Sequence, residues 1–286
     1  MGIVLVTDSS SDVRGEEINK LNLKVVPLKV NFGTKEYKDG VDLSVDEFYK
    51  LLETEKEFPK TSQPSPQDYV DIFEEAKENG DEVIVITISS GLSGTYQSVL
   101  LAKDIAEYDK VYVIDSLSCL TSLRCLVMCA VKLRDQGKTA KEIVDEIEVL
   151  KHHVHIFSVV DTLEGFYRGG RLSKTLYTLG SLLNLKPFMV LSKDGKIITN
   201  GKSMGYMKAY NVAAEQNKKY PINKEYGLFY GYTMGEDKLN KFIEKSFKQF
   251  GLETYDVSRI GCVSGAHVGC GGCCMAYIST KERDEK

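Results

Sequence analysis

Short apolar runs rich in β-branched residues alternate with longer amphipathic stretches in the first half of the chain. The runs at residues 3–7, 24–32, 82–88 and 111–115 predict buried strands. Apolar residues recur at helical spacing between these runs, which predicts helices over 12–21, 44–52, 66–79 and 94–107. Two more helices are predicted after Asp115, and Thr139 with Glu142 forms a capping box that opens the second. Strands and helices that alternate in this way are typical of a parallel sheet with both faces covered. Residues 1–155 are therefore predicted to form a Rossmann-like α/β domain.

The pattern changes after residue 155. A strand at 155–160 is followed by a stretch rich in Gly and Arg, and the apolar runs 187–192 and 196–199 flank Lys193-Asp194-Gly195-Lys196, a strong hairpin signal. A helix at 208–219, a strand at 226–232, a helix at 237–250 and two final strands complete the prediction. We expect residues 156–286 to form a second α/β domain, with a cleft between the two.

Composition excludes several classes of protein. The hydrophobic fraction of 42% and charged fraction of 27% are those of a globular protein, and a net charge of -4 gives no case for nucleic-acid binding. No apolar run reaches the ~18 residues of a membrane-spanning helix, and the N-terminus has no signal-peptide pattern, so we expect a cytoplasmic protein. In that compartment the seven cysteines should be free thiols.

Polar loops follow three of the predicted strands. Thr7-Asp8-Ser9-Ser10, the Ser/Gly-rich loop at 89–95, and Asp115-Ser116 all fall at strand carboxyl ends, where parallel sheets bind ligands, and Thr61-Ser62 precedes another helix. Hydroxyls and the free N–H groups of a helix start can seat an anion. The same residue types are also ordinary caps and turn formers, so each loop alone stays ambiguous.

The segment 265–272 has four glycines in eight residues around His267. So many glycines suggest backbone that passes close to another group, although a flexible loop with a solvated histidine has the same composition. A hydrolytic triad of Ser93, His267 and Asp8 or Asp115 is one alternative, but a nucleophile elbow requires Gly where Thr95 stands.

A zinc site is the other alternative for this segment. Cys262, His267, Cys270 and Cys273 include one pair at ligand spacing, but a structural zinc site usually needs a second pair, and the chain has none. Consecutive Cys273 and Cys274 fit better the start of a strand, whose neighbouring side chains point to opposite faces.

Several motifs in order resemble the DegV family, whose better-understood members are bacterial fatty-acid-binding proteins of the FakB type. The motifs span nearly the whole chain. They are Val6–Ser10, Thr61–Ser65, Ile88–Tyr96, Val113–Ser116, Gly169–Ser173, Leu185–Pro187 with Asp194–Lys196, and Gly265–Gly269.

The resemblance implies a non-catalytic, two-domain α/β protein that buries one long-chain fatty acid in a tunnel between the domains. The family's carboxylate ligands match Thr61, Ser93 and His267, with Ser62, Gly94, Asp8 and Ser9 in the adjacent loops. It implies no cofactor and no metal, a transient contact with membranes, and a partner kinase that phosphorylates the bound acid with ATP. A Ser93/His267 lipid esterase is the alternative. Apolar residues offered as tunnel lining are Phe157, Phe166, Leu172, Leu176, Leu179, Leu182, Leu183, Phe188 and Met189.

The chain departs from the family pattern at three places. FakB-type proteins carry a basic Val-Arg-Thr stretch after the hairpin, but Met204 stands at the Arg position here. Methionine cannot form a forked contact with phosphate, so either Lys202 or Lys208 supplies the charge or this protein does not serve that kinase. The loop after Asp115-Ser116 lacks the family's small glycines, and Cys270 replaces a usual Pro.

Overall fold

The computed structural model describes residues 2–180 and 185–284. Its first layer is a four-stranded sheet in the order β2-β1-β6-β7, and every neighbouring pair is parallel. Alternate residues face opposite sides, so Val83 and Val85 pack against α3 and α4 while Ile84 and Ile86 pack against α5 and α6. The bounds are β1 Ile3–Asp8, β2 Leu23–Val26, β6 Glu82–Thr87, β7 Val111–Asp115, α3 Gln67–Asn79, α4 Thr95–Ala106, α5 Leu120–Asp135 and α6 Ala140–His153.

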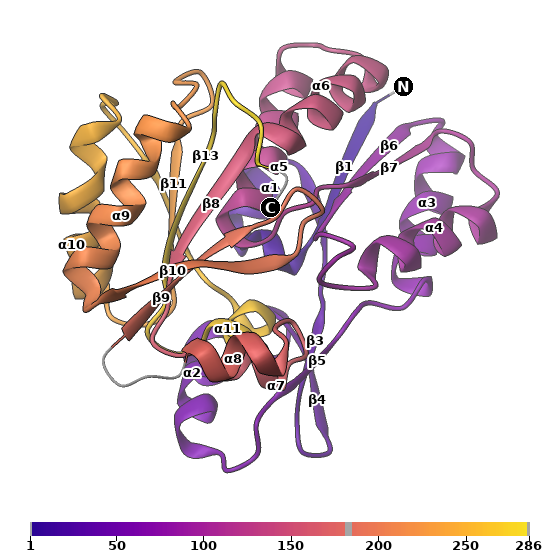
Figure 1. The fold of residues 1–286 in the computed structure, drawn as a ribbon. Helices are drawn as coiled ribbons and strands as arrows, with labels where there is room; N and C mark the ends of the chain where they lie inside the picture. The colour runs from indigo at the N-terminus through magenta and orange to yellow at the C-terminus, as the bar shows by residue number, and fades with distance from the viewer. Residues whose placement is uncertain (1, 181–184, 285–286) are drawn as a thin grey trace.

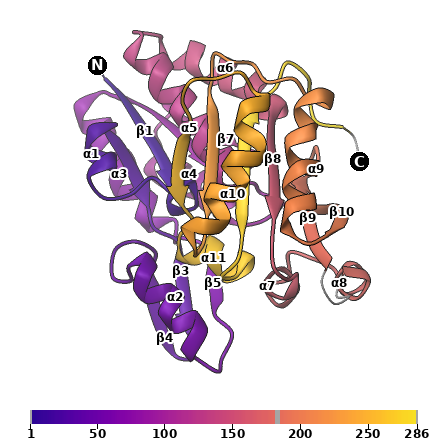
Figure 2. The same cartoon turned by 90° about the vertical axis from the view of Figure 1, so that its left-hand side faces the viewer.

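A six-stranded sheet forms the second layer, in the order β10-β9-β8-β13-β11-β12. All its pairs are antiparallel except β11 with β12. Helices α9 and α10 cover its outer face, and α5 lies between this sheet and the parallel one (Figures 1 and 2). The bounds are β8 Val154–Val159, β9 Leu185–Leu191, β10 Ile197–Met204, α9 Tyr206–Lys219, β11 Leu228–Tyr232, α10 Glu236–Ser246, β12 Asp256–Arg259 and β13 Cys273–Ile278.

A small antiparallel sheet, β4-β3-β5, stands at the lower end of the molecule in Figure 1. Helices α2 and α11 share a separate apolar cluster with it, and α7 packs on α11. The remaining bounds are η1 Ser9–Ser11, α1 Glu16–Lys20, β3 Lys29–Phe32, β4 Lys35–Lys38, α2 Val45–Thr54, β5 Lys60–Ser62, α7 Glu164–Arg168, α8 Lys174–Gly180, η2 Phe247–Gln249 and α11 Cys262–Val268.

Most predicted elements are confirmed. Capping boxes open α2 at Ser44 and α6 at Thr139, and Lys193–Lys196 joins the β9–β10 hairpin. Cys273 and Cys274 begin β13 and face different apolar clusters, as predicted. The seven cysteines are free. No helix within the described ranges is long and apolar enough to cross a membrane. In chain order the six-stranded sheet begins with β8, close to the predicted boundary at residue 155. That residues 1–155 and 156–286 form two separate domains stays a prediction.

Four predictions of local structure were wrong. The single strand over 24–32 is two strands in different sheets, because Pro27 has no N–H for a ladder and ends β2. The helix over 12–21 is only α1, because Asp12 and Gly15 have positive φ. Thr61 was expected in a loop and lies in β5. The glycine-rich segment begins as helix α11, so His267 lies on a helix rather than in a flexible loop.

Candidate functional site

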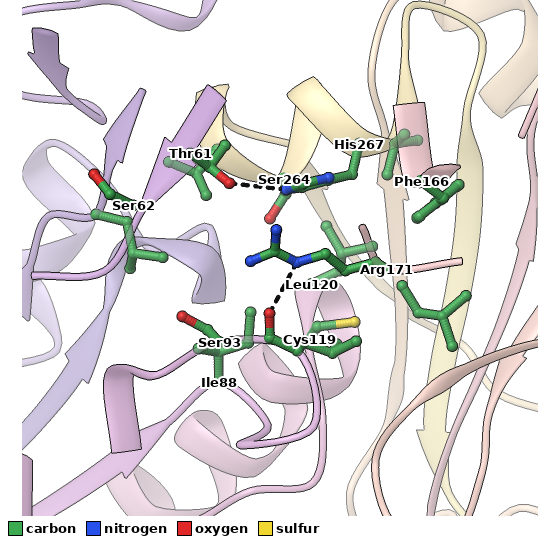
Figure 3. A pocket seen from close by; sticks show the side chains of 15 residues that line it. Thr61, Ser62, Ile88, Ser93, Cys119, Leu120, Phe166, Arg171, Ser264 and His267 are labelled. Atoms are coloured by element: carbon green, nitrogen blue, oxygen red, sulfur yellow. Dashed lines mark hydrogen bonds between the residues drawn. The ribbon is translucent and has the colours of Figure 1, made fainter. Parts of the chain in front are cut away.

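A cavity of about 520 Å³, which includes its opening to solvent, lies where the three sheets meet. Thr61, Ser93 and His267, the three predicted ligands, all line it, and Ser62 does so as well (Figure 3). They come from β5, the loop before α4, and α11. The other lining residues are Leu28, Ile88, Leu92, Cys119, Leu120, Phe166, Arg171, Ile197, Val263, Ser264 and Val268.

Thr61 and His267 form a contact between segments far apart in the chain. Thr61 Oγ1 lies 3.0 Å from His267 Nε2, and either atom can be the donor. Two glycines, Gly165 within α7 and Gly169 at its end, allow α7 to approach this histidine. A Cβ on Gly169 would lie 2.2 Å from His267 Nδ1, and one on Gly165 would lie 2.3 Å from the carbonyl oxygen of His267. Glycine is therefore required at both positions by close packing.

Ser93 is placed by the start of α4. Its Oγ lies 2.9 Å from Thr95 Oγ1. A Cβ on Gly94 would lie 1.9 Å from the side-chain oxygen of Gln63, whose amide donates to Ser98 Oγ at 2.8 Å. Gly94 thus lets the segment after β5 rest on α4, which brings Thr61 to the same cavity as Ser93.

His267 is neutral near pH 7. Burial, and then the nearby Arg171 charge, lower its pKa to about 4, and the carbonyl of Gly165 opposes this shift only in part. A neutral imidazole has one N–H, and the contact with Thr61 consumes one donor of the pair. The pair therefore keeps at most one donor for a ligand and carries no charge.

Arg171 lines the cavity although the sequence analysis assigned it no role, and it stands in the Gly169–Ser173 motif. Its guanidinium lies in the middle of the cavity, between Thr61 and His267 on one side and Ser93 on the other (Figure 3). Its Nε donates to the carbonyl oxygen of Leu92 at 3.0 Å. Within residues 2–180 and 185–284 no carboxylate lies within ion-pair distance of it, and burial lowers its pKa. It is a partly desolvated cation that lacks an anion.

The cavity continues into an apolar inner cavity of about 390 Å³, a volume that again includes space open to solvent. The two share Cys119, Leu120, Phe166, Ile197 and Val268, so together they run from the polar mouth toward the six-stranded sheet. The rest of the inner lining is Ile156, Ser158, Met189, Val190, Leu191, Ile260, Cys273 and Cys274.

Only some of the residues that were predicted to line a tunnel line the cavities. Phe166 and Met189 line the cavities. Phe157 and Phe188 belong instead to the core under α9 and α10, and Leu172 is buried beside the cavities without lining them. Leu182 and Leu183 lie outside the described residues, as do the side chains of Leu176 and Leu179.

Asp8, Ser9 and Gly94 support the site without lining the cavity. Asp8 is buried and accepts from the N–H of Ile88 at 2.7 Å, which fixes the loop that leads to Ser93. Burial raises the pKa of Asp8 to about 6. Ser9 accepts from the N–H of Leu28 at 3.1 Å. These residues hold backbone rather than ligand.

The esterase arrangement receives no support. Ser93 contacts Thr95, while His267 contacts Thr61 on the far side of Arg171 (Figure 3). Asp115 accepts from backbone N–H groups of Ser90 and Leu117, at 3.0 and 3.1 Å, rather than from the histidine. The zinc arrangement is likewise unsupported, because Cys262 and Cys273 belong to different apolar clusters and no group of three metal-ligating side chains occurs in the described ranges.

The family model of the uncharacterised DegV family proteins matches residues 2–280 of this chain. A DegV domain-containing protein of Clostridium acetobutylicum is 37% identical over 280 residues, which cover 96% of this chain and 98% of the relative.

Solved structures of the same fold cover the whole chain. A DegV family protein of Thermus thermophilus, described by its fatty-acid binding, has a TM-score of 0.87 and 31% identity over 97% of this chain and 100% of its own. A stearic-acid-binding protein of Eubacterium ventriosum has a TM-score of 0.87 and 28% identity over 98% of each chain. The Fatty Acid Kinase B3 protein of Streptococcus pneumoniae, loaded with linoleic acid, has a TM-score of 0.86 and 26% identity over 98% of this chain and 100% of its own.

Proposed function

This chain belongs to the DegV family, and from that premise we propose that it binds one long-chain fatty acid. The carboxylate lies at the polar mouth with Thr61, Ser93 and His267, and the acyl chain occupies the apolar inner cavity. One observation carries the proposal: Arg171, a cation with no carboxylate within ion-pair distance among the described residues, lies at the polar mouth of a cavity whose inner part is apolar. The fatty acids bound by proteins of the same fold support it.

The apolar part of the cavity dominates the affinity. Each buried CH₂ contributes about 0.8 kcal/mol, so a chain of about fifteen carbons gains on the order of 10 kcal/mol before the costs of ordering. A hydrogen bond to a charged group contributes roughly 1.5–3 kcal/mol. The mouth therefore fixes the orientation of the ligand, and the inner cavity holds it.

Arg171 supplies the positive charge for the bound carboxylate. Because His267 is neutral and contacts Thr61, the two residues together offer the carboxylate one uncharged donor, and the hydroxyl of Ser93 offers another. The guanidinium can pair with both carboxylate oxygens. This division of roles accounts for a half-buried arginine that has no carboxylate partner among the residues that the structure describes.

We further propose that the protein catalyses nothing and presents the carboxylate to a separate ATP-dependent kinase. The mouth holds donors and a cation, and among the described residues the side-chain partner of Ser93 is the hydroxyl of Thr95 rather than a base that would activate it as a nucleophile. The Streptococcus pneumoniae neighbour, named as part of a fatty acid kinase, supports this partnership. Met204, at the departure from the family pattern, is 60% exposed and Lys208 is exposed, so a partner could reach both. The side chain of Lys202 lies outside the described residues.

Native mass spectrometry of the freshly purified protein, followed by extraction and identification of lipid, tests the binding function. We expect a mass excess of one fatty acid per chain. After removal of lipid, titration with palmitate, stearate and linoleate should restore that excess and rank the chains. A protein that is isolated without lipid and gains no mass from any of the three acids would refute the proposal.

A further inference from the structure

A second hollow lies away from the lipid cavities, at the start of α9. We call it the Met204–Lys241 groove. None of its lining residues lines either part of the lipid cavity. Its residues come from the end of β10, the first turns of α9, and α10. They are Met204, Gly205, Tyr206, Met207, Lys208, Tyr210, Lys238 and Lys241.

The groove exposes apolar surface. Met204 is 60% exposed and Met207 is 42% exposed, and both line this one groove. Adjacent exposed apolar side chains framed by polar ones mark interaction sites more often than scattered ones do. Methionine is unbranched and polarisable, so it adapts to the shape of an apolar partner.

The rim of the groove is strongly basic. Lys208 and Lys241 are exposed, and in the part of the chain that the structure describes neither has a carboxylate within 4 Å. Lys238 does have one, but it shares Asp161 with Lys186, at 3.2 and 2.9 Å. Of the three lysines that line the groove, only Lys238 has an ion-paired carboxylate, on a protein whose net charge is -4.

The floor of the groove is rigid. The ring of Tyr206 lies under two lysines, with Lys186 Nζ 4.6 Å and Lys238 Nζ 4.7 Å from its centroid. Its hydroxyl accepts from Lys238 at 2.9 Å. Tyr210 stacks on Phe242 of α10 with centroids 4.6 Å apart. A surface already fixed in this way loses little conformational entropy when a partner binds.

We propose that the Met204–Lys241 groove docks an acidic amphipathic helix of a partner protein. Apolar side chains at i and i+3 or i+4 of that helix contact Met204 and Met207, and its acidic side chains meet Lys208 and Lys241. The concave shape suits a helix better than a flat bilayer, which contacts side chains that project. A second copy of the same face is excluded by charge, because it would bring the two sets of lysines together.

The experiment uses the full chain with its bound lipid and a designed peptide of about five helical turns, with leucines on one face and glutamates on the other. We expect binding that Lys208→Glu/Lys241→Glu weakens at least ten-fold, and that Met204→Ser/Met207→Ser weakens by a similar factor. The matched control is Leu101→Ser/Ile105→Ser, which removes equally exposed apolar side chains from α4 and should leave peptide binding unchanged.

Three outcomes overturn the proposal. The first is that a scrambled peptide of the same composition binds as tightly as the designed one, or that neither peptide binds. The second is that the protein binds vesicles containing phosphatidylglycerol, and that the lysine variant loses this vesicle binding but still binds the peptide. The third is a concentration-dependent dimer in sedimentation that the methionine variant dissolves. Thermal melts of each variant, and its retained fatty-acid content, show that the fold and the lipid site are intact, so a failure here is distinct from a failure of the fatty-acid proposal.

Discussion

The mouth and the inner end of the proposed lipid cavity are built in opposite ways. The mouth takes side chains from four separated segments, from Thr61 to His267, each placed by a hydrogen bond or a glycine contact. The inner end is formed by neighbouring strands of one sheet and the start of α5. The mouth is thus a set of separately placed polar contacts, and the inner end is a continuous apolar surface. Loss of one mouth residue should cost a part of the affinity, whereas filling the inner end should abolish binding.

Met189→Trp gives the largest expected effect. Met189 lies in β9, is 3% exposed and lines the inner cavity, so an indole would occupy the space of several methylene groups of the ligand. We expect palmitate affinity to fall more than 100-fold in a fluorescence or calorimetric titration. Met189→Leu keeps the volume nearly constant and is the control. A correctly folded tryptophan variant that binds palmitate normally would show that the acyl chain lies elsewhere.

Arg171→Gln should have the next largest effect. The glutamine keeps a hydrogen-bond donor but removes the positive charge. Palmitate affinity should therefore fall roughly 10–30-fold, which is ~1.4–2 kcal/mol and lies at the lower end of the range for a hydrogen bond to a charged group. Binding of hexadecanol, which has no charge, should change little. Arg168→Gln is the control, because Arg168 pairs with Glu164 outside the cavity. An equal loss for acid and alcohol would assign Arg171 a structural role only.

His267→Ala should weaken palmitate binding by a smaller factor, about 3–10-fold, because it removes one neutral donor. The fold should persist, since alanine favours the helix that carries this position. Thr61→Val should have a similar effect, and the double variant should lose less than the two single losses together, because the residues contact each other. Full additivity in this cycle would contradict a shared head-group contact.

The smallest expected effect is that of pH. The lowered pKa of His267, about 4, means that the imidazole stays neutral throughout the range from pH 6 to pH 8. Palmitate affinity at concentrations below micelle formation should therefore change less than about two-fold across this range. If His267 kept its ordinary pKa, acidification through pH 6.5 would charge it and the attraction to the carboxylate would raise the affinity. Such a rise, absent from His267→Ala, would show that the histidine is charged when the ligand is bound.

Local patterns were enough for the regular elements and for part of the site. The alternating strands and helices of the first half, the capping boxes at Ser44 and Thr139, and the hairpin at Lys193–Lys196 all follow from neighbouring residues, so the sequence alone predicted them. The choice of Thr61, Ser93 and His267 came from the resemblance, and the structure places all three on one cavity. Their roles as ligands stay predictions.

Arg171 shows what local patterns could not reveal. Its motif, two glycines before an arginine, was visible, but its position between Ser93 and His267 depends on α7 lying against α11. Likewise, Gly94 is a turn residue by its neighbours, and only the contact with Gln63 shows why a side chain cannot fit there.

The sequence by itself determined the class of fold, the order of most elements and the polar loops, because periodicity, caps and turns are properties of residues close together in the chain. The tertiary structure alone decided that 24–32 divides between two sheets, that His267 is neutral, and that Arg171 faces the cavity without a carboxylate. Each of these depends on burial and on contacts between residues far apart in sequence, and the free energy of a charge depends on what surrounds it rather than on its neighbours in the chain.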